Sequence, residues 1–199
     1  MGLTPARMTR RARIAFAVTT ILSFALLWYF HDRFWYPTDD GFYGNIAERL
    51  LGGETLGRDL QDLHPGYIHV LNAAAMRLFG LSLVSMRYPL ILVSLAEAGL
   101  VFALFVRRTL ALAISAAILV VSVGVVQFFD PTPNWYTLTL AVATAAWLTT
   151  KAPLSSRAIF VAGLFVGAAT MFRQLSGIWL AMGLVYVLLQ PSGTTVRRS

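Results

Sequence analysis

Three polar segments that lie far apart in the sequence carry the side chains most capable of chemistry. They are the carboxylate pair Asp39-Asp40, the turn residues Asp130 and Asn134, and the pair Arg173-Gln174. Carboxylates can accept protons and guanidinium groups can bind anions, so together these groups would form a polar site. Such a site requires that the intervening elements bring the three segments to one place.

The composition of those elements predicts a membrane protein. The chain has 199 residues, of which 57% are hydrophobic and 13% charged, with a mean hydropathy of +0.68. This excess of apolar residues cannot be buried in one water-soluble domain. The absence of cysteine excludes a disulfide scaffold and a cysteine-ligated metal site. The net charge of +7 does not indicate a nucleic-acid partner, because the basic residues form short clusters between apolar runs.

Several apolar stretches approach the ~20 residues that a membrane-spanning helix needs. They are residues 14–30, 86–106, 110–129 and the shorter 135–150. The first could be a signal peptide, but no small-x-small cleavage site follows it, so we interpret it as an uncleaved anchor. A further stretch, 158–190, would be ~50 Å long as one helix, and Arg173-Gln174 interrupts it. We expect this stretch to be a hairpin of two short helices.

The basic clusters predict how the chain is oriented. They lie at residues 7–13, 107–108, 151–157 and 197–198. All of them fall on one side only if 158–190 crosses twice, and positive residues favour the cytoplasmic side. We therefore expect an all-α protein of the cell membrane with about six transmembrane helices and both termini in the cytoplasm. A basic N-terminus (1–13) then precedes the transmembrane module (14–190), and a cytoplasmic tail (191–199) follows it.

The first outer loop, residues 31–85, differs from the rest of the chain in composition. Seven of the nine acidic residues lie between His31 and Gly66. Residues 39–51 predict a short helix with an acidic start and a Gly-Gly stop, and residues 65–79 predict a helix along the membrane interface. This large first outer loop thus carries short interfacial helices, and it lies on the same face as the other two polar segments.

Each polar group also has an ordinary structural interpretation. Asp39 or Asp40 can cap the helix that follows, and Asp130 with Asn134 can form a tight turn. Arg173 can extend along the bilayer surface with its guanidinium among the headgroups. Groups of this kind are costly beside lipid unless they pair or line a wet cavity, and three connections deliver them to one face. We therefore expect an outward-facing polar site at the membrane boundary.

Three other ionisable residues are less informative. His64 is a weak signal by itself, and His69 is expected to face the membrane interface. Glu97 lies in the middle of a predicted span, where a carboxyl group must be protonated or paired inside the bundle.

Residues 37–53 resemble the first outer loop of GT-C type membrane glycosyltransferases, in particular the dolichyl-phosphate-mannose protein mannosyltransferase-like bacterial enzymes. The shared pattern is an acidic pair (Asp39-Asp40), an aromatic residue soon after it, and then Ala, Arg, Leu and Gly. Four further segments are similar to family motifs in the same order: 64–66, 79–82 with Arg87, Asp130-Pro131, and the Gly-rich helix 163–174 that ends in Arg-Gln.

Two positions and the length depart from the family pattern. Gly66 replaces a usual proline, and Asp40 stands where Glu is common. Members of the family normally run to several hundred residues, so the resemblance covers the N-terminal portion of such an enzyme.

The resemblance implies an enzyme that transfers a sugar from a polyprenyl-phosphate carrier to a hydroxyl at the outer face, with inversion at the anomeric carbon. The acceptor would be a lipid, a glycan or a protein, and membrane lipid would surround the enzyme. Asp39 would be the base that takes the hydroxyl proton. Arg87 and Arg173 would stabilise the phosphate leaving group, while Asp40 and Asp130 would orient the sugar or the acceptor, or hold a cation. The remaining candidate binding residues are Tyr43, His64, Asn134 and Gln174.

The resemblance does not require a cofactor, and a divalent cation is possible but not indicated. A divalent cation would need Asp39, Asp40, Asp130 and His64 to converge as ligands. The alternative function is a truncated, non-catalytic membrane protein or a transporter-like lipid-binding subunit. A transporter would be expected to carry charged or broken segments at mid-membrane in repeated halves, whereas no repeat is seen and only Glu97 lies deep.

Overall fold

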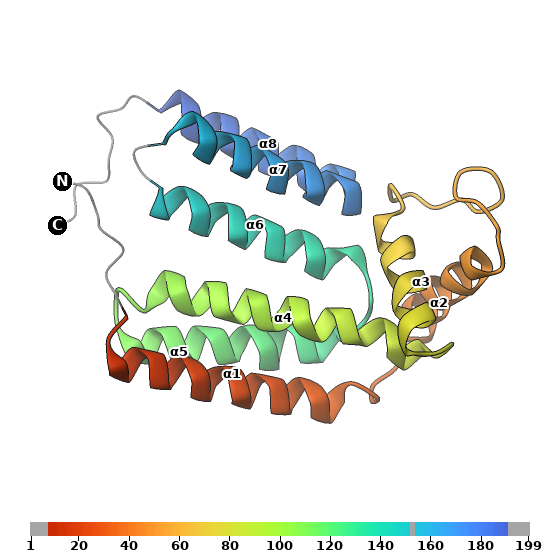
Figure 1. Ribbon diagram of the computed structural model, residues 1–199, viewed down its shortest axis with the longest axis horizontal. Coiled ribbons are helices and arrows are strands. Elements are labelled where there is room, and N and C mark those ends of the chain that lie inside the picture. Colours follow the sequence, from red (N-terminus) through yellow and green to blue (C-terminus); the bar gives the residue numbers. More distant parts are fainter. Residues whose placement is uncertain (1–7, 152–153, 191–199) are drawn as a thin grey trace.

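The computed structural model describes residues 8–151 and 154–190, and these residues are helical without any β-strand. One set of helices runs side by side along the long axis of the molecule (Figure 1). This bundle consists of α1 (Arg10–Phe30), α4 (Leu83–Phe105), α5 (Leu110–Leu119), α6 (Pro133–Thr150), α7 (Ser156–Phe172) and α8 (Gln174–Leu189). The predicted all-α class is confirmed.

Within the part of the chain that the structure describes, three helical segments are long and apolar enough to cross a membrane: α1, α4 and the continuous stretch Leu110–Phe128. That last stretch consists of α5, a π-helical turn η1 (Val120–Gly124) and a 3₁₀ turn η2 (Val125–Phe128). The helices α7 and α8 are apolar but shorter. These segments expose many large apolar side chains along their lengths, as a helix bundle surrounded by lipid would.

Local sequence explains where the bundle helices begin. The hydroxyls of Thr9, Ser82, Thr109 and Ser155 each accept a hydrogen bond from a backbone N–H in the first turn of the following helix. This satisfies one of the N–H groups that have no partner within a helix. The helix α6 begins instead with Pro133, which lacks an N–H and is favoured at a first helical position.

The helix α4 lies at the centre of the bundle and packs against α1, α5 and α6. Its buried face meets small residues on α5, which let the two backbones approach closely. The resulting core contains Leu27, Leu90, Phe102, Ala113, Ala117, Val121 and Phe129 among its buried members. Glu97 of α4 is also buried, and its Oε2 accepts a hydrogen bond of 3.0 Å from the Thr139 hydroxyl of α6. This bond supplies the partner that a carboxyl group inside the bundle requires.

The helices α2 (Pro37–Leu51) and α3 (Tyr67–Phe79) pack against each other at one end of the bundle (Figure 1). We call this the α2–α3 end. The helix α1 ends there, while α4, α6 and α8 begin there. The basic clusters at the start of α1, after α4 and between α6 and α7 lie at the opposite end, so the two ends differ in charge.

The structure contains the helix break that was expected near Arg173. The helix α7 ends at Phe172, and α8 begins at Gln174 and packs back against α7. Arg173 itself has an extended backbone, with φ −152° and ψ 107°. The stretch 158–190 is therefore a pair of helices with Arg173 at the α2–α3 end.

Candidate functional site

A pocket of about 410 Å³ lies between the start of α2 and the start of α6, and it brings two of the three predicted polar segments together. Of the residues that line this pocket, Asp39 lies in the first turn of α2, and the remaining ones come from η2, the following turn and α6. The pocket is lined by Asp39, Phe128, Asp130, Asn134, Trp135 and Leu138. We call it the acidic pocket, because both of its ionisable side chains are carboxylates.

Asp39 and Asp40 have different surroundings although they are neighbours in the sequence. Successive residues of an α-helix point about 100° apart, so only one of the pair can face the interior. Asp39 is exposed and lines the acidic pocket. Asp40 is buried, and its Oδ2 accepts hydrogen bonds from the Tyr36 N–H at 2.8 Å and from Arg87 Nη2 at 3.0 Å. Burial raises the pKa of Asp40, while the Tyr36 N–H and Arg87 oppose this increase.

Arg87 is buried at the start of α4, and the protein itself uses most of its hydrogen-bonding capacity. Its Nη1 donates to the carbonyl oxygens of His31 and Arg33, and its Nη2 donates to the carbonyl of Phe34 and to Asp40. The guanidinium also lies 3.9 Å from the centre of the Trp35 ring, within the range of a cation–π interaction. Of its five N–H groups only the buried Nε–H has no partner. The structure therefore gives Arg87 a positioning role between α1, α2 and α4, in place of the phosphate contact that the resemblance implied.

Asp130 is almost fully buried in the turn before α6, with 8% of its surface exposed. The Trp135 indole Nε1 donates to Asp130 Oδ1 at 3.3 Å and to the Phe128 carbonyl at 2.8 Å. Burial raises the pKa of Asp130 to about 6, and the charges of Asp39 and Asp40 act in the same direction. The buried Asn72 of α3 donates to the Pro131 carbonyl at 3.2 Å, which fixes this turn against the α2–α3 end.

Arg173 joins the tip of the α7–α8 hairpin to the start of α6. Its Nη1 donates to Asn134 Oδ1 over 2.6 Å, and both side chains are exposed. Asn134 also lines the acidic pocket, so a guanidinium lies next to a pocket whose own walls carry only negative charge. Gln174, the first residue of α8, is exposed and has no side-chain hydrogen bond among the described residues.

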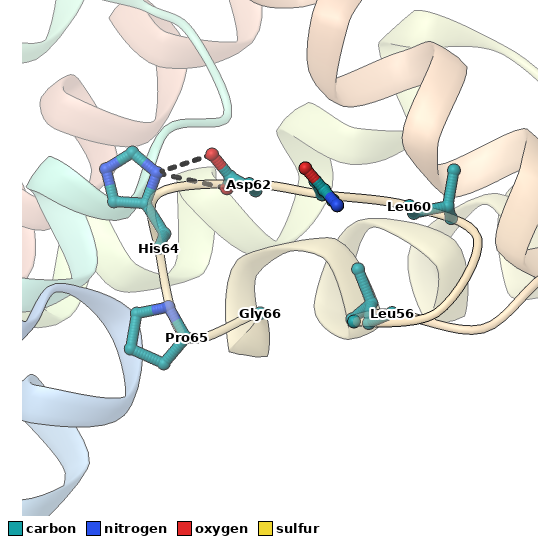
Figure 2. Close-up of a pocket in the computed structure, with 8 residues that line it drawn as sticks. Leu56, Leu60, Asp62, His64, Pro65 and Gly66 are labelled. Atoms are coloured by element: carbon teal, nitrogen blue, oxygen red, sulfur yellow. Dashed lines mark hydrogen bonds and ion pairs between the residues drawn. The ribbon is translucent and has the colours of Figure 1, made fainter.

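His64 lines a different, open pocket of about 370 Å³ in the connection between α2 and α3. Figure 2 shows its ring turned toward Asp62, with Nδ1 3.0 Å from Asp62 Oδ2. The same carboxylate oxygen lies 2.5 Å from His69 Nε2. The expectation that His69 faces the membrane interface is wrong, because its side chain is fully buried. Burial alone would raise the pKa of Asp62, but the hydrogen bonds from His69 and His64 outweigh it and lower this pKa.

Tyr43 lies between these two groups of polar side chains. It is buried in α2, and its ring stacks on the His69 ring with the centres 5.4 Å apart. Burial raises the pKa of its phenol, and the negative charges of Asp62, Asp39 and Asp130 add to this effect. The phenol is therefore a neutral hydrogen-bonding group at neutral pH.

The four side chains considered as cation ligands do not form one cluster. Asp39 and Asp130 line the acidic pocket, Asp40 is paired with Arg87, and His64 is paired with Asp62. In residues 8–151 and 154–190, no group of three or more His, Asp or Glu side chains is arranged to hold a metal ion.

Sequence reasoning missed two residues of this region. Trp135 lines the acidic pocket, and its indole N–H donates to Asp130. The available signal was Pro133, which marks the start of a helix and so places Trp135 in the first turn after Asp130. Asp62 holds both His64 and His69, and its spacing of two and seven residues from them was the available signal. Comparison with known proteins identifies no relative: no family model, no curated protein and no solved structure matches the chain.

Proposed function

We propose that the protein is a membrane glycosyltransferase of the GT-C type, which moves a sugar from a polyprenyl-phosphate carrier to an acceptor hydroxyl. The observation that carries this proposal is the acidic pocket, where Asp39 and Asp130 share one cavity and Arg173 is held beside it by Asn134. Carboxylates and a guanidinium are the groups that transfer from a phosphate ester to a hydroxyl needs. Support also comes from the sequence, in which five segments similar to motifs of the GT-C family occur in the same order as in that family.

We place the acidic pocket on the outer face of the cell membrane. Under this proposal all six bundle helices cross the bilayer and both termini are cytoplasmic. The separation of charge supports this orientation, because the basic clusters lie at the end of the bundle opposite α2 and α3. A polyprenyl-phosphate carrier keeps its hydrocarbon chain in the bilayer and its phosphate among the headgroups. Its phosphate would then lie at the same depth as the pocket.

In the proposed reaction, Asp39 takes the proton of the acceptor hydroxyl as its oxygen attacks the anomeric carbon. The bond between that carbon and the phosphate oxygen breaks, and the polyprenyl phosphate leaves with the electron pair. Attack from the face opposite the leaving group inverts the configuration. Arg173 binds the phosphate and stabilises its additional negative charge, because a guanidinium presents several N–H donors in one plane.

The buried residues act by holding these groups in position. Arg87 fixes the start of α2 through Asp40, and this fixes the direction in which Asp39 projects. Asp130 orients a hydroxyl of the sugar or of the acceptor, with the Trp135 indole holding its carboxyl group. Tyr43, His64 and Gln174 keep the supporting roles in substrate binding that the resemblance implies. The acceptor is a lipid, glycan or protein hydroxyl.

The test is sugar transfer by the purified full chain in lipid nanodiscs. Short polyprenyl phosphates that carry a radiolabelled hexose are incubated with lipid and peptide acceptors at the outer-face pH, with and without added divalent cation. We expect label in an acceptor or, with water as the acceptor, release of free sugar with inverted configuration. If the chain binds these lipids but never releases or transfers sugar, the non-catalytic lipid-binding alternative replaces the enzyme.

A further inference from the structure

Trp135 has surroundings that differ from those of a tryptophan anchored among lipid headgroups. Its indole N–H is fully engaged by the Phe128 carbonyl and by Asp130, at 2.8 and 3.3 Å. The ring packs partly against the bundle core. It also lies close to Gly124, where the Cβ of a larger residue would be 4.0 Å from the ring. Trp135 also lines the acidic pocket. The indole is thus a fixed aromatic wall of a cavity.

The other groups that line the acidic pocket complete a pattern suited to one kind of ligand. One face of a pyranose presents C–H groups, which carry partial positive charge and are attracted to the negative face of an aromatic ring. The hydroxyls at the edge of the sugar ring need acceptors and donors, which Asp130 and Asn134 supply. The volume of about 410 Å³ falls within the usual range for small-molecule pockets.

The charge of the lining restricts which sugars fit. Both ionisable side chains in the wall are carboxylates, and the nearest cation, Arg173, bonds to Asn134 at the rim. A uronic acid or another acidic sugar would bring a third carboxylate into this partly enclosed space, where like charges repel strongly. A pyranose without an acidic group meets no such repulsion.

We infer that the acidic pocket holds the sugar of the donor as a non-acidic pyranose stacked on Trp135, with its hydroxyls bonded to Asp130 and Asn134 and with Asp39 left to accept the proton of the acceptor hydroxyl. This inference rests on the proposed function and extends it to the class of sugar and to a binding residue. Trp135 then contributes to recognition of the sugar and not of the polyprenyl phosphate. Arg173 at the rim is left to bind the phosphate.

The experiment measures binding of short polyprenyl phosphates to the full chain in nanodiscs. The probes are the bare lipid phosphate, a panel carrying glucose, mannose or galactose, and one carrying glucuronic acid. We expect at least one neutral hexose to bind about tenfold more tightly than the bare lipid, and the glucuronic acid form to show no such gain. Trp135→Leu should remove the gain and leave binding of the bare lipid unchanged, while Trp135→Phe should keep most of it.

The matched control is Trp147→Leu. Trp147 lies on the same helix, and its indole N–H donates to the Ala158 carbonyl at 2.9 Å, but it does not line the pocket. This variant should bind every probe as the wild type does. If Trp135→Leu keeps the preference for hexose, or if glucuronic acid is preferred, the inference is overturned while the enzyme proposal stands. If the wild type binds none of the lipids, both are overturned.

Discussion

Arg87 Nη2 lies 3.0 Å from Asp40 Oδ2, and neither side chain has more than 1% of its surface exposed to solvent. The pair joins the start of α4 to the start of α2, and the same guanidinium holds three carbonyl oxygens of the chain between α1 and α2. This buried ion pair therefore determines where α2 begins and which way the neighbouring Asp39 points.

Removing the guanidinium should strongly destabilise the fold. Arg87→Met leaves the Asp40 carboxylate buried without its partner, and the loss of one member of a buried pair costs about 3–5 kcal/mol. Thermal unfolding in detergent should show a large decrease in Tm. Arg77→Ala is the matched control, because Arg77 lies on the exposed side of α3 and its loss should change stability by less than about 0.5 kcal/mol. Equal Tm values for the two variants would contradict the role of Arg87.

The raised pKa of Asp130 should make stability depend on pH. The folded pKa of about 6 exceeds the ordinary value of 3.8, so the folded state holds the proton more tightly than the unfolded state. The stabilisation is fully present below pH ~4 and is lost as pH rises through 6, with a total on the order of 1–3 kcal/mol. Chemical unfolding between pH 4 and 7.5 should show this decrease in the wild type, and Asp130→Asn should reduce it. An unchanged pH slope in the variant would contradict the burial of the carboxyl group.

Asp62 should give the opposite pH dependence. Its pKa is lowered because the hydrogen bonds from His69 and His64 outweigh the effect of burial, so its contribution is present at neutral pH and is lost as pH falls below ~4. Asp62→Asn should lower the Tm at pH 7, since His69 is then buried beside a neutral amide. Asp59→Asn, in the same connection but on an exposed ion pair with Arg58, should change the Tm little. Similar losses in both variants would mean that the buried position of Asp62 has no special importance.

The proposed topology predicts which ends of the helices are accessible from outside the cell. The chain has no cysteine, so single cysteines report their own position. Gln174→Cys, at the exposed tip between α7 and α8, should react with a membrane-impermeant thiol reagent applied to intact cells. Ser156→Cys, at the other end of α7, should react only after the cells are opened. The reverse pattern would place the acidic pocket in the cytoplasm.

The periodicity and composition of the sequence were sufficient to predict the helices. The apolar stretches, the Gly-Gly after α2 and the Arg-Gln pair inside 158–190 each mark a real helix boundary. The π-helical turn in Val120–Gly124 was not predicted, although Ser122 and Gly124 interrupt the apolar pattern there. Helix formation depends on local sequence, and such local signals can be read without knowledge of packing.

The partners of the polar groups could not be read in the same way. Glu97 bonds to Thr139, and Arg87 to Asp40, across more than forty residues of sequence. Asp39 and Asp40 are residues of the same type, so the sequence does not show which of them faces inward. That depends on how α2 is rotated against α4. The buried position of His69 likewise follows from the packing of the α2–α3 connection, which composition does not specify.

The rate of sugar transfer by Asp39→Asn tests the proposed chemistry most directly. The amide keeps the shape of the side chain and its position in the first turn of α2, but it cannot accept the hydroxyl proton. Transfer from a hexose-bearing polyprenyl phosphate should fall by about 10²–10⁴-fold, with Tm and donor binding nearly unchanged. Asp59→Asn should keep full activity. If Asp39→Asn retains near-normal turnover while Asp130→Asn is inactive, Asp39 is not the base.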